Sequence, residues 1–251
     1  MFFVMPDLAS AVFWVALGKI IIANVILSGD NAVVIAMACR NLSDQHRRPA
    51  ILGGSLGAII LRVIFVFVIG WLMSVPYLKL VGGALLLWIG VKLVMEEEEE
   101  SDGIKGHGNL WAAVWTIIVA DAIMSLDNAI AIAAAAKNDG VLVILGLVIS
   151  IPIIIFGSTL LTKVLQRFPV LVILGGGLLG WIGGEVIATD GKPPGVEHAP
   201  PGSVAAFFEA RIPHAELVFS IAGAVLVVGL GMWLARRHKA AEDVADPAKK
   251  D

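Results

Sequence analysis

Cysteine and charged residues are both scarce in this chain, and each scarcity excludes a class of protein. The single cysteine, Cys39, excludes an internal disulfide framework and a metal site made of several thiolates. Only 16% of the 251 residues are charged, whereas soluble domains carry about 25%. The N-terminus has no basic region ahead of its apolar run and no small-residue cleavage site. We therefore expect no removable signal peptide.

Apolar residues dominate instead: 58% of the chain is hydrophobic, and the mean hydropathy is +0.90. A helix needs about 20 predominantly apolar residues to cross a bilayer, and several runs approach or exceed that length. We predict an all-α, polytopic membrane bundle of seven transmembrane helices that contacts the lipid bilayer and no nucleic acid. The predicted spans lie at about 19–39, 50–73, 77–95, 111–136, 141–163, 170–189 and 214–235.

The two halves of the chain repeat the same motifs. Residues 24–32 (NVILSGDNA) are echoed 97 positions later by residues 121–129 (DAIMSLDNA). Further on, the Trp-Ile-Gly triplet ending at Gly90 is matched at an offset of 93 by the triplet ending at Gly183. Each copy holds three predicted spans, and an odd number gives the two copies opposite orientations in the membrane. The sequence therefore predicts two inverted three-helix repeats and a C-terminal helix outside them.

These spans divide the chain into predicted parts. The first repeat, with a leading interfacial segment, covers 1–95, and the second repeat covers 111–189. The remaining parts are an acidic cytoplasmic loop at 96–110, an extracytoplasmic loop at 190–213, the seventh span at 214–235 and a polar tail at 236–251 that we expect to be disordered.

Lysine and arginine are distributed unevenly between the two sides that the spans define. Twelve lie on one side and four on the other. Cytoplasmic loops carry the excess of these residues. We therefore predict that the N-terminus lies outside and the C-terminus in the cytoplasm.

Both copies of the repeated motif place polar side chains inside a predicted span. They are Asn24, Ser28, Asp30 and Asn31 in the first copy, and Asp121, Ser125, Asp127 and Asn128 in the second. We call these eight residues the paired polar motifs. A charge at the bilayer centre costs roughly 2.5–3.5 kcal/mol on insertion scales, so such residues usually face a partner, an ion or a water-filled cavity.

The donors in the paired polar motifs are carboxylates, amides and hydroxyls, and they include no histidine or cysteine. Such hard oxygen donors argue against Zn²⁺ and Cu⁺ and favour Mg²⁺, Ca²⁺ or Mn²⁺. If the repeats meet at mid-membrane, a divalent cation offsets the gathered negative charge. Protonation of the empty site would do the same and would couple metal movement to protons. The alternative is that each polar residue only bonds to a neighbouring helix, which the duplication of the motif disfavours.

Two further charged residues fall within predicted spans. Arg62 either pairs with Asp30 or another carboxylate as a structural element, or serves as an internal counter-cation when no metal is bound. Glu185, near the outer end of the sixth span, either lines an exit path or reaches the lipid headgroups.

The paired polar motifs, together with the Gly-Gly…Trp-Ile-Gly segments ending at Gly90 and Gly183, resemble the TerC family of integral membrane proteins, and most of all its YjbE-type branch. The resemblance covers about residues 10–235. It implies a seven-span protein of the bacterial inner (plasma) membrane, associated with manganese efflux, with tellurium resistance by name, and with metal supply to exported proteins. It also implies that Asp30, Asp121 and Asp127 are metal ligands. The choice of Mn²⁺ comes from the resemblance, because the oxygen donors alone also allow Mg²⁺ or Ca²⁺.

Three hypotheses for the function follow. The first is a secondary transporter that exports Mn²⁺ by alternating access between the repeats. The second is a membrane protein that passes metal to exported partner proteins, with 190–213 as the contact surface. The third, an exporter of small organic solutes, needs an aromatic or cationic pocket, which the paired polar motifs lack. We expect no enzyme, because the sequence has no nucleophile–base pair, phosphate loop or catalytic metal motif. A homo-oligomeric state is left open.

Overall fold

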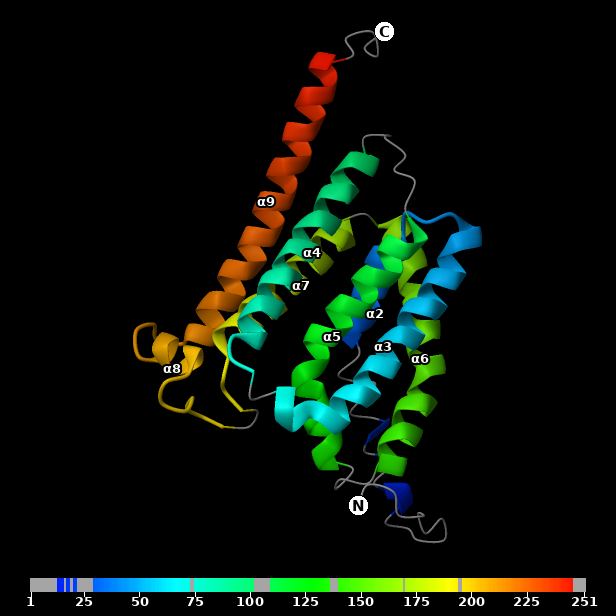
Figure 1. Cartoon of the computed structure of the whole chain (residues 1–251). Coiled ribbons are helices and arrows are strands. Elements are labelled where there is room, and N and C mark those ends of the chain that lie inside the picture. The colour runs from blue at the N-terminus through cyan, green and yellow to red at the C-terminus, as the bar shows by residue number, and fades with distance from the viewer. Residues whose placement is uncertain are drawn as a thin grey trace.

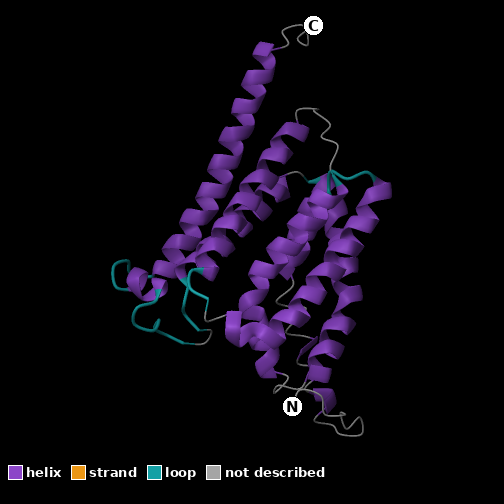
Figure 2. Cartoon of the chain, viewed as in Figure 1, coloured by secondary structure: helices purple, strands orange, loops and turns teal. Residues whose placement is uncertain are grey.

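The computed structural model describes residues 13–15, 17–18, 20–21, 29–72, 75–101, 109–135, 140–168, 170–193 and 196–245. All the regular structure in this part of the chain is helical (Figure 2), which confirms the predicted all-α class there. The helices are α2 (Gly29–Cys39), α3 (Asp44–Leu72), α4 (Leu78–Ser101), α5 (Leu110–Ala135), α6 (Gly140–Arg167), α7 (Val170–Ala188), α8 (Val204–Glu209) and α9 (Ala215–Ala245).

Several helices are long and apolar enough to cross a membrane. Among the described residues, four stretches qualify: Gln45–Val68, Leu78–Glu96, Val170–Ala188 and Ala215–Arg237. A fifth apolar stretch in the described part, Leu110–Leu126, is too short. Large apolar side chains such as Trp111 and Phe156 are exposed on the helices, as expected for a surface that contacts lipid. The chain is a polytopic helical bundle, but the count of seven spans is not confirmed: α2 has only 11 residues, and residues 22–28 lie outside the described part.

The helices form two groups that lie side by side (Figure 1). In one group, α2 and α3 each pack against α5 and α6. In the other, α4, α7 and α9 pack against one another. A core of buried apolar residues connects the groups, with Met37 of α2, Leu86 of α4, Met124 of α5 and Leu179 of α7 among its members.

Glycines allow α4, α7 and α9 to approach closely. A Cβ atom at Gly184 would overlap the backbone carbonyl of Phe219, and one at Gly180 would overlap that of Gly223. Backbone atoms cannot rotate away as a side chain can, so the approach of α7 and α9 requires residues without a side chain at these positions.

Two polar segments that we predicted outside helices are helical in the structure. The glutamate run at 96–100 forms the last turns of α4, where Lys92 lies one turn before Glu96, with Nζ and Oε1 3.8 Å apart. α9 likewise continues from Arg236 to Ala245, through a stretch that we expected to be disordered. Both segments are free of glycine and proline and rich in good helix formers, so intrinsic propensity extends each helix beyond its apolar part.

Candidate functional site

A buried ion pair connects the middle part of α3 with the middle part of α5. Arg62 Nη2 lies 2.5 Å from Asp121 Oδ1, and Arg62 Nε donates a hydrogen bond to Ser125 Oγ at 3.0 Å. Ser125 Oγ in turn donates to Asp121 Oδ2 at 3.0 Å. Arg62 is 2% exposed and Asp121 is 7% exposed. Both oxygens of the Asp121 carboxylate therefore accept hydrogen bonds within a buried polar network.

The spacing of residues along the two helices explains why these side chains meet. Residues four apart lie on the same helix face. On the contacting faces the successive residues are Gly54, Ala58 and Arg62 on α3, and Ile117, Asp121 and Ser125 on α5. The absence of a side chain at Gly54 lets Ile117 approach α3. The helices are thus already close where Arg62 reaches α5.

α2, which carries Asp30 and Asn31 of the first motif, packs against α5, which carries the second motif. Asn31, in the first turns of α2, is buried with 3% of its surface exposed, and Ser125 of α5 is fully buried.

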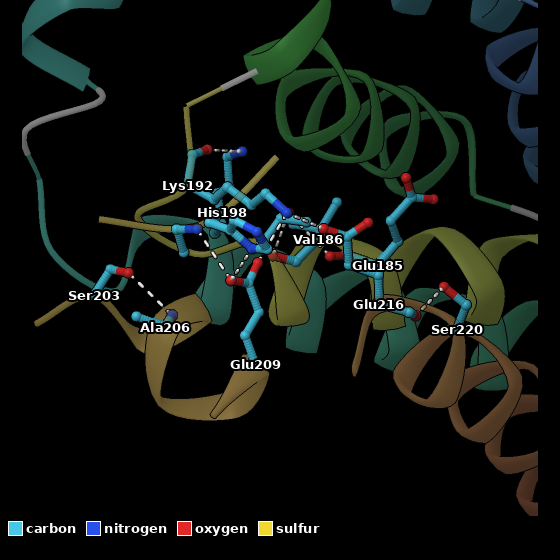
Figure 3. Close-up of polar contacts among 12 residues, drawn as sticks. Glu185, Val186, Lys192, His198, Ser203, Ala206, Glu209, Glu216 and Ser220 are labelled. Carbon is cyan, nitrogen blue, oxygen red and sulfur yellow. Dashed lines mark hydrogen bonds and ion pairs between the residues drawn. The ribbon is translucent and has the colours of Figure 1, made fainter. Parts of the chain in front are cut away.

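The described residues cover only part of the predicted cation site. Asn24 and Ser28 lie outside them, as do the side chains of Asp30, Asp127 and Asn128. Within the described part, no three histidine, cysteine or acidic side chains are grouped so as to hold a metal ion. Ligation of a metal by the paired polar motifs therefore stays a prediction. Glu185 is exposed on α7, and Figure 3 shows its carboxylate pointing away from the neighbouring Lys192.

A second polar cluster joins the connection between α7 and α9, which we predicted to be a loop at 190–213, to the first turn of α9. Lys192 Nζ lies 2.9 Å from Glu209 Oε1 and 2.7 Å from Glu216 Oε1 (Figure 3). Ser203 caps α8 by accepting a hydrogen bond from the Ala206 amide at 3.1 Å. A surface pocket of about 440 Å³ opens beside the cluster. We call Lys192, Glu209 and Glu216 the Lys192 cluster.

The same connection is attached to the start of α4. Asp190 Oδ1 accepts a hydrogen bond from the Lys79 amide at 3.2 Å, near the N-terminus of α4. Lys79 Nζ donates to the carbonyl oxygen of Lys192 at 3.4 Å. Because α4, α7, α8 and α9 are all tied to this connection, it is a folded part of the bundle.

The Lys192 cluster predicts a pH dependence for this connection. The hydrogen bond from Lys192 holds the pKa of Glu209 below its ordinary value of 4.5, and the hydrogen bond to Glu216 raises the pKa of Lys192 above 10.5. The Glu209 contribution to stability is therefore present above about pH 4.5 and lost as the pH falls through the lowered pKa. The Lys192 contribution is present below about pH 10.5 and lost as the pH rises through the raised pKa.

Hydrogen exchange in acid tests this dependence, because the Ala199 amide donates to Glu209 Oε2 at 3.0 Å. After correction for intrinsic rates, we expect Ala199 to lose several-fold of its protection as the pH falls below 4.5. Glu209→Gln should lower that protection already at pH 6, because it removes the charge that Lys192 binds, whereas Glu197→Gln at an exposed position should not. A flat pH profile in the wild type would contradict a stabilising role for the ion pair.

Comparison with known proteins places the chain in a family. Residues 9–239 match the family model described as integral membrane protein TerC family. The chain is 42% identical over 180 residues to the uncharacterized membrane protein YjbE of Bacillus subtilis, covering 72% of this chain and 82% of that protein. No solved structure matches the chain significantly.

More distant relatives match over a smaller share of their own length. It is 32% identical over 149 residues to the uncharacterized membrane protein YceF of Bacillus subtilis, covering 56% of this chain and 58% of YceF. It is 27% identical over 194 residues to the UPF0053 inner membrane protein YoaE of Escherichia coli K12, covering 70% of this chain but only 37% of YoaE. The family match spans nearly the whole chain and agrees with its helical bundle and apolar spans. The chain therefore belongs to the TerC family of integral membrane proteins.

Proposed function

We propose that this protein exports divalent metal cations, and Mn²⁺ in particular. The cation would pass through a site that the paired polar motifs form between two inverted repeats. The observation that carries the proposal is the buried Asp121, which is held by Arg62 and Ser125 inside a membrane bundle. Ionisable residues at such positions typically mark ion or substrate pathways. The choice of Mn²⁺ within the hard cations rests on the resemblance to the TerC family.

The charge of the proposed site matches a divalent cation. Asp30, Asp121 and Asp127 contribute three negative charges and Arg62 contributes one positive charge, so the net charge is 1 − 3 = −2. The contact between α2 and α5 supports pooling of these groups, because α2 carries Asp30 and α5 carries Asp121 and Asp127. A cation with two positive charges would offset most of the negative charge of the three carboxylates, and hard oxygen donors are the ligands such cations prefer.

Helix packing supports the inverted repeats. If α2, α3 and α4 correspond to α5, α6 and α7, the packing of α3 on α5 has its counterpart in the packing of α6 on α2. Two glycines that match at an offset of 93 lie at corresponding helix contacts. Gly82 of α4 lies beside Ile123 of α5, and Gly175 of α7 lies beside Met37 of α2. Alternating access by rocking of the two repeats is the mechanism we propose.

The distribution of basic residues supports an orientation. The turn between α2 and α3 and the C-terminal end of α9 lie at one end of the bundle, and α8 lies at the other (Figure 1). The first end carries Arg40, Arg47, Arg236 and Arg237. Because cytoplasmic ends are enriched in such residues, we propose that this end faces the cytoplasm of a bacterial cell, with the protein in the inner membrane.

Mn²⁺ flux in proteoliposomes tests the proposed function. Asp30→Asn and Asp127→Asn should each lower saturable flux roughly tenfold or more, because each removes a charged ligand of the cation. Glu197→Gln removes an exposed carboxylate outside the bundle interior and should leave flux within about twofold of wild type.

The outcome separates transport from the competing functions. If both aspartate variants fold and still carry Mn²⁺ at the wild-type rate, the proposed site is contradicted. If wild-type vesicles carry no Mn²⁺, and deletion of 190–213 in cells deprives exported proteins of their metal, metal delivery replaces transport as the function.

A further inference from the structure

Arg62 engages two predicted cation ligands at once. Its Nη2 binds one oxygen of Asp121, and its Nε donates to the hydroxyl of Ser125. The second oxygen of Asp121 accepts from the same hydroxyl. The oxygens that a metal ion would use at this point of the site are therefore already bound by a cation that belongs to the protein.

The two members of the ion pair come from different repeats, and neither has a charged counterpart in the other copy. At the offset of 97, the position of Asp121 is Asn24 in the first copy. At the offset of 93, the position of Arg62 is Ile155 in the second copy. The contact between α3 and α5 thus carries both a guanidinium and a carboxylate, whereas the matched positions in the sequence, Ile155 and Asn24, carry neither. The second copy thus has one carboxylate more than the first, namely Asp121, and Arg62 pairs with it.

We propose that Arg62 is the resident cation of the transport site: its guanidinium holds Asp121 and Ser125 while no metal is bound, and an entering divalent cation displaces it. This inference rests on the proposed function, namely binding of a divalent cation by the paired polar motifs. Cation binding and loss of the Arg62–Asp121 contact are then the same event. When the guanidinium returns to Asp121, it drives the metal ion out.

Two physical constraints lead to exchange instead of joint occupancy. A guanidinium stays protonated in proteins, so Arg62 cannot make room for a metal ion by losing its proton. Two cations that share the same oxygen atoms in a buried, low-dielectric environment repel each other strongly. The carboxylate in turn is costly to leave without any cation. Arg62 and the metal ion therefore compete for Asp121, and we expect the contact between α3 and α5 to loosen when the metal ion binds.

Titration calorimetry with MnCl₂ on the purified, full-length protein tests the competition. Arg62→Gln should tighten Mn²⁺ binding roughly tenfold, because it removes the competing cation. Arg62→Lys, which keeps the charge but not the two simultaneous contacts, should tighten binding less. Arg40→Gln is the matched control: Arg40 is also buried, at 5% exposure, but donates to the carbonyl oxygen of Leu93 at the end of the bundle. Its Mn²⁺ affinity should stay within about twofold of wild type.

Cross-linking with Arg62 intact tests displacement directly and does not depend on the folding of an Arg62 variant. An ideal Cβ at Gly54 lies 3.0 Å from Ile117 Cβ, close to the spacing of about 3.5–4.5 Å in disulfides. In a Cys39→Ala background, Mn²⁺ should slow disulfide formation in Gly54→Cys/Ile117→Cys by about fivefold. The pair Gly90→Cys/Val227→Cys between α4 and α9 should be unaffected.

The results separate this inference from the transport function. Mn²⁺ affinity in Arg62→Gln that equals or falls below that of wild type overturns the inference, as does cross-linking between α3 and α5 that ignores Mn²⁺. If wild-type vesicles nevertheless carry Mn²⁺, the proposed function stands without it. Tighter binding in Arg62→Gln together with Mn²⁺-dependent cross-linking, but without wild-type flux, supports the resident cation and rejects transport.

Discussion

Replacing Arg62 with methionine is expected to lower the free energy of unfolding by about 3–5 kcal/mol, because it leaves a buried carboxylate without its cation. Asp121 is 7% exposed, so water cannot take the place of the guanidinium. Chemical denaturation in a fixed detergent, monitored by circular dichroism, measures the change. As a control, Lys163→Met replaces a lysine that is exposed on α6. It should change the free energy of unfolding by less than about 0.5 kcal/mol.

A double variant separates the charge of Arg62 from its packing. Arg62→Met/Asp121→Leu removes both charges together, and replacing a buried ion pair with apolar residues is often neutral or stabilising. We expect the double variant to regain most of the stability that Arg62→Met loses. An equal loss in the single and double variants would show that the aliphatic part of Arg62, and not its charge, stabilises the contact between α3 and α5.

The second large effect is expected at the contact between α7 and α9. Gly184→Ala should destabilise the fold by about 1–3 kcal/mol, the usual range for overpacking, because its Cβ would overlap the backbone carbonyl of Phe219. The overlap can be relieved only by separating the two helices. The same denaturation experiment measures the loss.

Gly177→Ala on the same helix is the matched control. Its Cβ would lie 3.5 Å from Val228 Cγ2, which is an ordinary van der Waals contact. Alanine favours a helix by up to about 1 kcal/mol over glycine, so this variant should be as stable as wild type or more so. Equal destabilisation by both substitutions would contradict the close approach of α7 and α9 at Gly184.

The sequence predicts the apolar helices well because their length and composition carry the signal locally. The observed α3, α4, α5, α6, α7 and α9 each overlap a predicted span over almost its whole length. The ends of α4 and α9 were mispredicted for a physical reason. Composition marks the limit of the bilayer, but a helix ends only where backbone hydrogen bonding ends, and both helices continue into polar sequence.

The partner of Arg62 could not be predicted from the sequence. Helical periodicity shows which residues share a face, but not which face of another helix lies opposite, and several carboxylates were available to Arg62. The choice of Asp121 depends on the packing of α3 on α5. The Lys192 cluster was missed for a similar reason. Glu209 and Glu216 lie 17 and 24 positions after Lys192, and the segment between Lys192 and Glu209 has no periodic pattern.

The stoichiometry of Mn²⁺ binding tests most directly whether the two copies of the motif form one site. Equilibrium dialysis of the purified protein should give one Mn²⁺ per chain. Asp30→Asn and Asp127→Asn should each weaken the binding of that single ion roughly tenfold or more, because both carboxylates contact it. Two Mn²⁺ per chain, with each substitution removing one and leaving the other unchanged, would contradict a shared site, as would the absence of Mn²⁺ binding by the folded wild-type protein.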